Sequence, residues 1–206
     1  MIKNIVFDFG GVIIGLDKDR SVAAFRRLGA DAVAQYIDDY RSEDLFSDLE
    51  LGRITTTEFC EEVRRKSHPD IDDDSICRAW MLLLVGIKEQ KLKKIAQLRK
   101  RYRTLLLSNT NALHWEHSVK EYFKDTRLYF EKCYLSYELG IAKPSQEIFS
   151  HMINDSHITP AETLFIDDSQ TNCHAAEALG IHTWHVSTNE DWTETIDKLE
   201  ILCPCQ

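Results

Sequence analysis

The chain has 206 residues, of which 43% are hydrophobic and 29% are charged, and its formal net charge is −9. This length suits one substantial core domain with room for a smaller lobe. The longest apolar stretches, such as residues 80–85, are far too short to span a membrane. Lysine and arginine form no block long enough to predict a nucleic-acid partner.

The N-terminus does not resemble a signal peptide, because Asp8 interrupts its apolar run early. We therefore expect a cytoplasmic protein. The cysteines are scattered and none belongs to a Cys-x-x-Cys pair, which favours reduced thiols over a zinc site or a disulfide framework. They are Cys60, Cys77, Cys133, Cys173, Cys203 and Cys205.

The first predicted element covers residues 2–9, a β-branched and aromatic run that ends at Gly10 and Gly11. This pattern is typical of a buried strand followed by a tight loop. From about residue 17 to residue 85 the signals are helical, without strand-like alternation. Thr55 and Glu58 form a capping box. Helical spacing of apolar residues continues through Ile76, Trp80, Leu83 and Leu84.

After Gly86, short apolar runs alternate with helical patterns. We expect strands near residues 104–108, 133–135, 163–166 and 182–186, and a closing helix over residues 192–202. Thr159 and Glu162 form a second capping box, with Pro160 at the first helical position. Alternating strands and helices predict a parallel sheet covered on both faces. The sequence therefore predicts an α/β protein, with a Rossmann-like core of residues 1–15 and 87–206 and a small inserted helical lobe of residues 16–86.

Polar side chains stand at the carboxyl ends of the predicted strands, where ligands bind in such sheets. In chain order they are Asp8, Ser108 with Asn109, Lys143, and Asp167 with Asp168. Each is ambiguous alone, because an aspartate or asparagine after a strand is also an ordinary turn or cap residue, and a loop lysine is usually solvated.

Together these segments resemble the four motifs of the haloacid dehalogenase superfamily, in that family's order and over essentially the whole chain. They are Val6-Phe7-Asp8-Phe9-Gly10-Gly11-Val12-Ile13, Leu106-Leu107-Ser108-Asn109, Gly140-Ile141-Ala142-Lys143-Pro144 with Phe149, and Phe165-Ile166-Asp167-Asp168-Ser169 with Asn172. The resemblance implies that residues 16–86 are the family's small cap. A subgroup with the first motif Asp-x-Gly-Gly/Asn-Val looks similar, and it includes phosphatases of sugar phosphates such as glucose 1-phosphate.

The resemblance implies that Asp8 is a nucleophile that forms an aspartyl-phosphate. Such a covalent step splits phosphate-ester hydrolysis into two easier reactions. Ser108 and Asn109 would hold the phosphoryl oxygens. Lys143 would orient Asp8 and offset the negative charge of the transition state.

A magnesium ion is the implied cofactor, because it takes carboxylate oxygens, waters and substrate phosphate as ligands. Asp8 and Asp168 would bind it directly, and Asp167 directly or through water. By resemblance, the backbone carbonyl of Gly10 completes the protein's share. The expected partner is a small phosphate ester, and the sequence does not determine the oligomeric state.

Position 10 departs from most phosphatases of the family, which carry a second aspartate there as general acid and base. Glycine has no side chain to protonate the leaving oxygen, and this help is typically worth ~10²–10⁴ in rate. A good leaving group would reduce the loss, or Asp17 or a water could take the role. The third possibility is a weakly active or degenerate relative. Arg20, Arg53 and Tyr36 are candidate substrate contacts from the cap, although residues of these types in such positions are more often solvated or packed within the lobe.

Two further alternatives use the same nucleophile. Dehalogenation of a 2-haloacid needs no metal, so the pair Asp167 and Asp168 argues against it. A phospho-aspartate switch, as in receiver domains, places its acidic pair before the phosphorylated aspartate and its lysine last, which is not the order found here.

Overall fold

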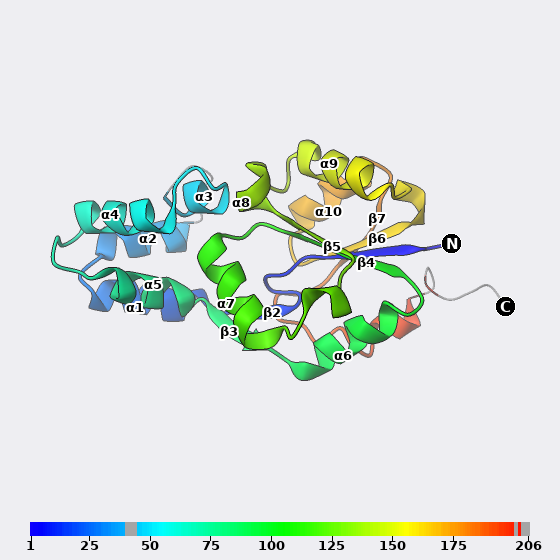
Figure 1. The fold of residues 1–206 in the computed structure, drawn as a ribbon, viewed down its shortest axis with the longest axis horizontal. Coiled ribbons are helices and arrows are strands. Elements are labelled where there is room, and N and C mark those ends of the chain that lie inside the picture. Colours follow the sequence, from blue (N-terminus) through cyan, green and yellow to red (C-terminus); the bar gives the residue numbers. More distant parts are fainter. Residues whose placement is uncertain (40–44, 200–201, 203–206) are drawn as a thin grey trace.

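The computed structural model describes residues 1–39, 45–199 and 202. It consists of a sheet with flanking helices and a group of helices at one end (Figure 1). The sheet has five parallel strands in the order β5-β4-β1-β6-β7, which confirms the predicted α/β fold. They are β1 (Asn4–Phe7), β4 (Arg103–Ser108), β5 (Lys132–Leu135), β6 (Thr163–Asp167) and β7 (His182–His185).

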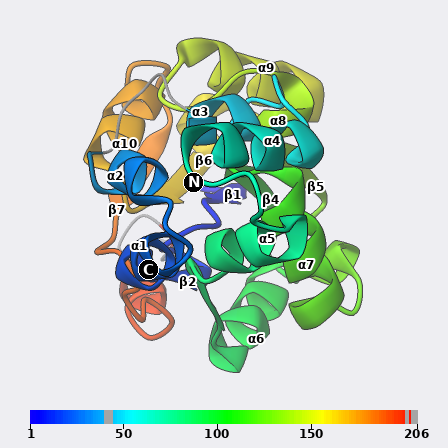
Figure 2. The ribbon, with the colours of Figure 1, turned by 90° about the vertical axis from the view of Figure 1, so that its left-hand side faces the viewer.

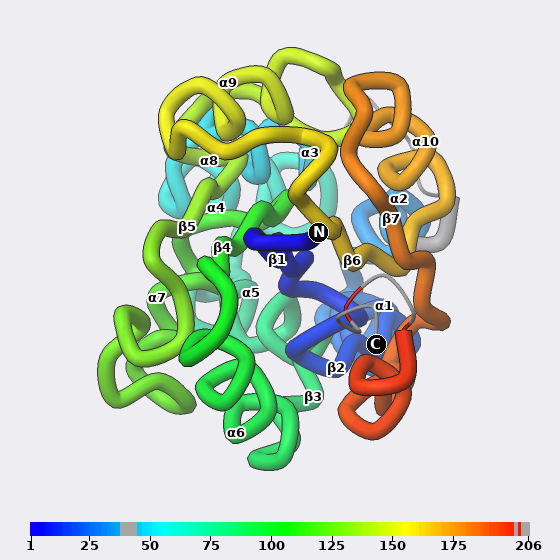
Figure 3. Tube along the Cα trace, turned by 90° about the vertical axis from the view of Figure 1, so that its right-hand side faces the viewer, coloured from blue at the N-terminus to red at the C-terminus, as the bar shows by residue number. Residues whose placement is uncertain are grey.

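Helices cover both faces of this sheet. Figure 3 shows β1 between β4 and β6, with α9 and α10 on one side and α6 on the other. The helices are α6 (Glu89–Leu98), α7 (Ala112–Tyr122), α8 (Ser136–Leu139), α9 (Gln146–Ser156) and α10 (Gln170–Glu177), with 3-10 turns η1 (Thr126–Leu128), η2 (Pro160–Glu162) and η3 (Ile196–Lys198).

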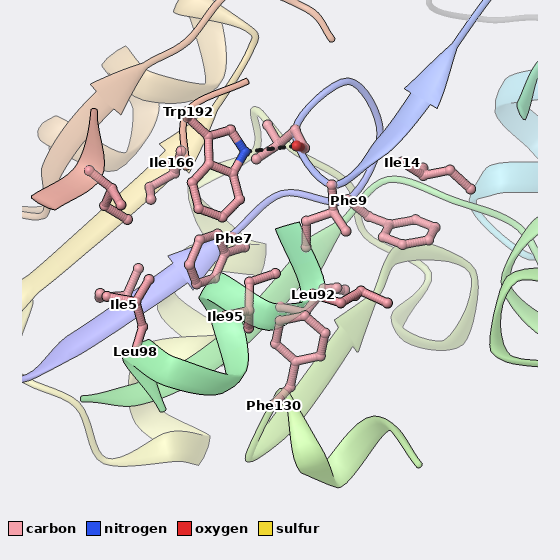
Figure 4. Packing of buried hydrophobic residues seen from close by; sticks show 14 of the residues in the cluster. Ile5, Phe7, Phe9, Ile14, Leu92, Ile95, Leu98, Phe130, Ile166 and Trp192 are labelled. Atoms are coloured by element: carbon pink, nitrogen blue, oxygen red, sulfur yellow. Dashed lines mark hydrogen bonds between the residues drawn. The ribbon is translucent and has the colours of Figure 1, made fainter. Parts of the chain in front are cut away.

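The side chains of β1 alternate between the two faces, as a strand requires. Ile5 and Phe7 pack with Ile95 of α6 and with Trp192 in one cluster (Figure 4). Val6 faces the opposite cluster, which is formed with α9. Both faces of β1 are fully buried, and burial of each large apolar side chain stabilises the fold by about 1.5–3 kcal/mol. A rigid central strand therefore carries the residues that follow it.

The second lobe consists of five helices between β2 and β3, and it faces the viewer in Figure 2. They are α1 (Lys18–Arg27), α2 (Asp31–Asp39), α3 (Leu45–Glu50), α4 (Thr56–Lys66) and α5 (Asp73–Met81). They enclose their own apolar cluster, in which Phe46 contacts the rings of Phe59 and Trp80 at centroid distances of 5.5 and 4.4 Å. The predicted capping box is confirmed, with Thr55 and Glu58 bonded reciprocally at the start of α4.

An antiparallel ribbon of β2 (Ile14–Leu16) and β3 (Leu84–Ile87) joins the lobe to the sheet, and we call it the neck. The prediction that residues 17–85 contain no strand was wrong at β3. Helix α5 ends at Met81, and the backbone of the following β3 pairs with β2; within β3, Gly86 has a φ of +114° that a helix cannot hold. The expected lobe boundaries, after residues 15 and 86, fall inside these two strands.

Two helix predictions in the second half were also wrong in detail. Residues 192–199 form only the short turn η3, because Trp192 is buried against the core and holds the segment there; residues 200 and 201 of the expected helix lie outside the described residues. Thr159 makes no side-chain cap, because the N–H of Glu162 donates to the backbone carbonyl of Thr159 at 3.0 Å and the Glu162 side chain pairs with Lys3 at 2.7 Å; the helical turn itself is present.

Among the described residues, no helix combines the length and the apolar character needed to cross a membrane. Four cysteines of this part of the chain are free thiols: Cys60, Cys77, Cys133 and Cys173. Cys203 and Cys205 lie outside the described residues.

Candidate active site

The carboxyl end of β1 places Asp8 at the centre of the sheet edge. Its N–H continues the ladder to β6 by donating to the carbonyl of Ile166 at 2.9 Å, so its backbone is fixed. Its side chain is buried, and Oδ1 accepts the N–H of Phe9 at 2.7 Å. The loop that follows turns back at once, because Ile13 and Ile14 both donate to the carbonyl of Phe9. The carboxylate therefore projects from a tight and well-anchored turn.

Lys143 lies between two of the predicted carboxylates. Its Nζ is 2.7 Å from Oδ1 of Asp8 and 2.7 Å from Oδ2 of Asp167, and its side chain is almost completely buried. The backbone of Lys143 is held by Asn109, whose Oδ1 accepts its N–H at 2.9 Å and whose Nδ2 donates to its carbonyl at 2.8 Å. The side chain of Asn109 thus fixes the lysine, a contact that the sequence did not reveal.

The carboxylates of Asp8, Asp167 and Asp168 offer oxygens that all lie within 4.8 Å of one another. Asp167 is oriented from behind, because its Oδ1 accepts the N–H of Ser169 at 2.7 Å and the Nδ2 of Asn172 at 3.1 Å. Asp168 is only partly buried. The structure therefore brings together the three acidic residues that the sequence nominated from the two ends of the chain.

This cluster has too little positive charge of its own. Three carboxylates surround one ammonium group, which leaves two negative charges uncompensated when all are ionised. Burial raises the pKa of Asp8 to about 7 despite the adjacent Lys143, and Asp167 adds to the rise. Burial alone lowers the pKa of Lys143, but the carboxylates of Asp8 and Asp167 hold it above its ordinary value. A divalent cation with oxygen preference fits this donor set, because it supplies the missing charge.

Ser108 ends β4, two residues after Leu106, which pairs with Phe7 of β1 directly before Asp8. The residue is buried and its Oγ makes a long contact of 3.3 Å with the carbonyl of Asn109. Next along the chain, Thr110 donates its N–H to Oγ of Ser136, and that hydroxyl donates to the carbonyl of Glu50 at the end of α3. The helical lobe therefore touches the same turn that carries Ser108.

A model of the haloacid dehalogenase-like hydrolases matches residues 2–180. The chain belongs to this family. The D-ribitol-5-phosphate phosphatase of Bacteroides thetaiotaomicron is 38% identical over 200 residues, which cover 95% of this chain and 97% of that enzyme. This match extends over both lobes and all four motifs of the hydrolase.

Solved structures agree with the family. A HAD family enzyme from Bacteroides thetaiotaomicron, in complex with magnesium and inorganic phosphate, superposes with a TM-score of 0.89 at 39% identity over 95% of this chain and 99% of that chain. The L-2-haloacid dehalogenase of Xanthobacter autotrophicus superposes with a TM-score of 0.64 at 17% identity over 98% of this chain and 85% of that chain. At this identity the second likeness shows a shared fold alone.

In this hydrolase the space beside Gly10 is filled by a residue of the neck. A Cβ at position 10 would lie 3.1 Å from Cδ1 of Leu16, so the side chain of Leu16 stands where the missing aspartate would begin. Asp17, the alternative proton donor, uses Oδ1 to accept the N–H of Arg20 at 3.3 Å as the N-cap of α1.

The candidate cap residues of the hydrolase are spread over its helical lobe. Arg53 pairs with Asp48 at 3.1 Å, and the hydroxyl of Tyr36 lies 3.4 Å from Nζ of Lys66. Arg20 is exposed near the start of α1. Arg53 and Tyr36 thus contact other residues of the lobe itself.

The turn after β7 holds two site residues that sequence reasoning missed. Thr188 donates from Oγ1 to Oδ2 of Asp168 at 2.6 Å, and Asn189 donates its N–H to the carbonyl of Gly11 at 2.7 Å. The rule that ligands gather at strand ends applies to β7 as well, and a polar Ser-Thr-Asn segment directly after the strand was the available signal.

Proposed function

We propose that this haloacid dehalogenase-like hydrolase is a magnesium-dependent phosphatase of a small phosphorylated polyol or sugar. The observation that carries the proposal is the convergence of Asp8, Asp167 and Asp168 within 4.8 Å beside the buried Lys143. Support comes from the relative that is a D-ribitol-5-phosphate phosphatase and from the similar structure that contains magnesium and phosphate.

Asp8 is the proposed nucleophile. A bond forms between one of its carboxylate oxygens and phosphorus, the bond between phosphorus and the ester oxygen breaks, and the departing oxygen takes a proton. Water then attacks the aspartyl-phosphate and releases inorganic phosphate, which regenerates the carboxylate of Asp8. Because the backbone of Asp8 is fixed between β4 and β6, the nucleophile is held in place before substrate binds.

The hydroxyl of Ser108 is proposed to bind a phosphoryl oxygen, and Nζ of Lys143 to hold Asp8 and offset the charge of the transferring group. We assign Asn109 to the same site through two routes. Its side chain positions Lys143, and its backbone lies in the turn that binds the phosphoryl group.

The proposed ligands of magnesium are the carboxylates of Asp8 and Asp168, the backbone carbonyl of Gly10, and Asp167 directly or through water. When bound, the ion supplies positive charge that lets an anionic ester approach an anionic nucleophile. The excess negative charge of the cluster and the raised pKa of Asp8 are what such a site shows without its cation.

The substrate class follows from the cap and from the relative. We propose that residues 16–86 form a cap that excludes water and favours small metabolites over macromolecules. The 5-phosphate of ribitol is an ester of a primary alcohol, whose alkoxide is a poor leaving group and needs a proton. Because position 10 is a glycine and has no carboxyl group, we propose that the proton comes from a bound water, or from Asp17 after a movement of the cap.

The remaining alternatives predict different behaviour. A 2-haloacid dehalogenase has no use for a cation, and the acidic cluster therefore argues against that reaction. A degenerate relative would bind phosphate esters without turnover, in spite of an intact nucleophile, lysine and acidic pair.

The test is phosphate release from a panel that contains D-ribitol 5-phosphate, other polyol and sugar phosphates, glucose 1-phosphate and p-nitrophenyl phosphate, with Mg²⁺ and with EDTA. We expect release that requires Mg²⁺ and is abolished in Asp8→Asn. No Mg²⁺-dependent release from any ester would instead establish the degenerate alternative, and equal release by Asp8→Asn would exclude Asp8 as the nucleophile.

A further inference from the structure

The carboxylate of Asp168 is held by a residue far along the chain. Thr188 follows β7 and donates its hydroxyl to Oδ2 of Asp168 at 2.6 Å. The loop after β1 also approaches this oxygen closely, because a Cβ on Gly11 would lie 2.1 Å from Oδ2 of Asp168 and 3.1 Å from Cγ2 of Thr188. The orientation of Asp168 is therefore set by contacts with Thr188 and Gly11.

Asn189 fixes the position of Thr188. Its backbone has a φ of +66°, which turns its N–H toward the carbonyl of Gly11 at 2.7 Å. Its side chain pairs with both backbone groups of Leu16, since Oδ1 accepts the N–H and Nδ2 donates to the carbonyl, each at 2.8 Å. An amide that bonds both groups of one residue copies the edge of a neighbouring strand, so it holds β2 of the neck as another strand would.

The same segment continues to brace the loop after β1. Trp192 donates from Nε1 to the carbonyl of Val12 at 2.8 Å, the bond drawn in Figure 4. The buried Lys91 also donates to that carbonyl, at 2.5 Å. Asn189 thus bonds to Gly11 and Leu16, and Trp192 bonds to Val12. All three partners lie in the segment that follows Asp8.

We propose that Thr188 and Asn189 form a positioning clamp for the metal site, which orients Asp168 and locks it to the nucleophile loop and to the neck. The inference rests on the proposed function, since it concerns the same magnesium site. It goes beyond the four family motifs, because Thr188 and Asn189 lie after residue 180, where the family model ends. Residues that orient a metal ligand through a hydrogen bond typically change metal affinity 10–100-fold when they are lost.

The experiment is calorimetric titration of the full-length protein with Mg²⁺ alone. Thr188→Val keeps the shape of the side chain but removes the donor to Asp168, so we expect Mg²⁺ to bind roughly tenfold more weakly. Thr188→Ser retains the hydroxyl and is expected to bind Mg²⁺ nearly as the wild type does. The matched control is Thr195→Val in the same segment, an exposed threonine whose side chain caps nothing, and it is expected to leave Mg²⁺ binding unchanged.

Asn189→Gly tests the second half of the clamp. Glycine accepts a φ of +66° and keeps the N–H that bonds Gly11, but it loses both contacts with Leu16. We expect weaker Mg²⁺ binding, in the same direction as Thr188→Val. Unchanged binding would remove Asn189 from the clamp.

Asp168→Asn separates this inference from the proposed function. If Asp168→Asn loses Mg²⁺ binding and Thr188→Val does not, the clamp is wrong and the metal site stands. If Asp168→Asn binds Mg²⁺ as the wild type does, the metal site itself is wrong. Melting temperatures in EDTA complete the test, because a purely structural role would lower the melting temperature of Thr188→Val without altering its Mg²⁺ affinity, and that result would overturn the clamp.

Discussion

Asp8→Asn should abolish turnover and, without metal, make the folded protein more stable at high pH. Burial raises the pKa of Asp8 from 3.8 to about 7, so the folded state binds the proton of Asp8 more tightly than the unfolded state does. The contribution of Asp8 to the free energy of unfolding is fully present below its pKa in the unfolded state. This contribution is lost as the pH rises through its pKa in the folded state. Between pH 5 and pH 8 the linkage amounts to about 2–3 kcal/mol. Asparagine has no such proton to lose.

The assay is urea unfolding in EDTA at pH 5 and pH 8 for both proteins. We expect the free energy of unfolding of Asp8→Asn, relative to the wild type, to rise by about 2–3 kcal/mol between the two pH values. Asp70→Asn is the control, because Asp70 is an exposed aspartate of the helical lobe and does not belong to the acidic cluster. A constant difference between Asp8→Asn and the wild type, or phosphate release by the variant, would refute the reasoning.

Three further predictions follow from the same cluster. Lys143→Met leaves Asp8 and Asp167 without their buried cation, so unfolding in EDTA at pH 8 should become easier by about 3–5 kcal/mol, and an unchanged urea midpoint would contradict this. Mg²⁺ affinity, measured by calorimetry, should fall roughly tenfold per pH unit below pH 7, because protons compete for Asp8; a flat profile down to pH 5 would count against Asp8 as a ligand. The Cβ introduced by Gly10→Asp requires Leu16 to move by a few tenths of an ångström, and this variant should raise turnover of a primary alkyl phosphate more than that of p-nitrophenyl phosphate, whose leaving group needs no proton. An unchanged ratio would show that proton donation at position 10 does not limit the reaction.

The sheet and its order of elements were predictable because their signals are local. β1, β4, β5 and β6 each contain a short apolar run, and both faces of β1 are buried, as its continuous apolar sequence indicated. The neck was not predictable in the same way. Its strand β3 is a Leu-Val-Gly-Ile segment that continues a helical pattern, and it becomes a strand because β2 supplies a partner from 70 residues earlier in the chain.

The closing segment failed for a related reason. Apolar spacing from Trp192 onward indicated a helix, but Trp192 is drawn into the core between the sheet and Lys91. Its indole N–H finds a backbone carbonyl there, at Val12. Tertiary packing of one large side chain therefore overrode the local pattern.

In the candidate site, the sequence likewise predicted the residues proposed for the chemistry better than the contacts that hold those residues in place. Asp8, Lys143 and the pair Asp167 and Asp168 could be nominated from sequence because the four family motifs carry these residue types in a fixed order. Asn109 was nominated for phosphate binding, which stays a prediction, and its side chain also holds the backbone of Lys143, a contact that the sequence did not predict.

Asn109 and Asn189 make the same kind of contact at two places in the candidate site. Each uses its amide to bond both the N–H and the carbonyl of one distant residue, Lys143 in the first case and Leu16 in the second. Every residue has a backbone N–H and carbonyl of the same kind, apart from the N–H of proline. The sequence therefore shows the asparagine but does not show which backbone its side chain bonds. The site therefore contains two asparagine side chains with the same role: Asn109 positions Lys143, and Asn189 positions the neck. Asn189 pairs with the neck, and the neighbouring Thr188 donates to Asp168. If the clamp prediction holds, the attachment of the helical lobe and the binding of the metal are therefore coupled through Asn189.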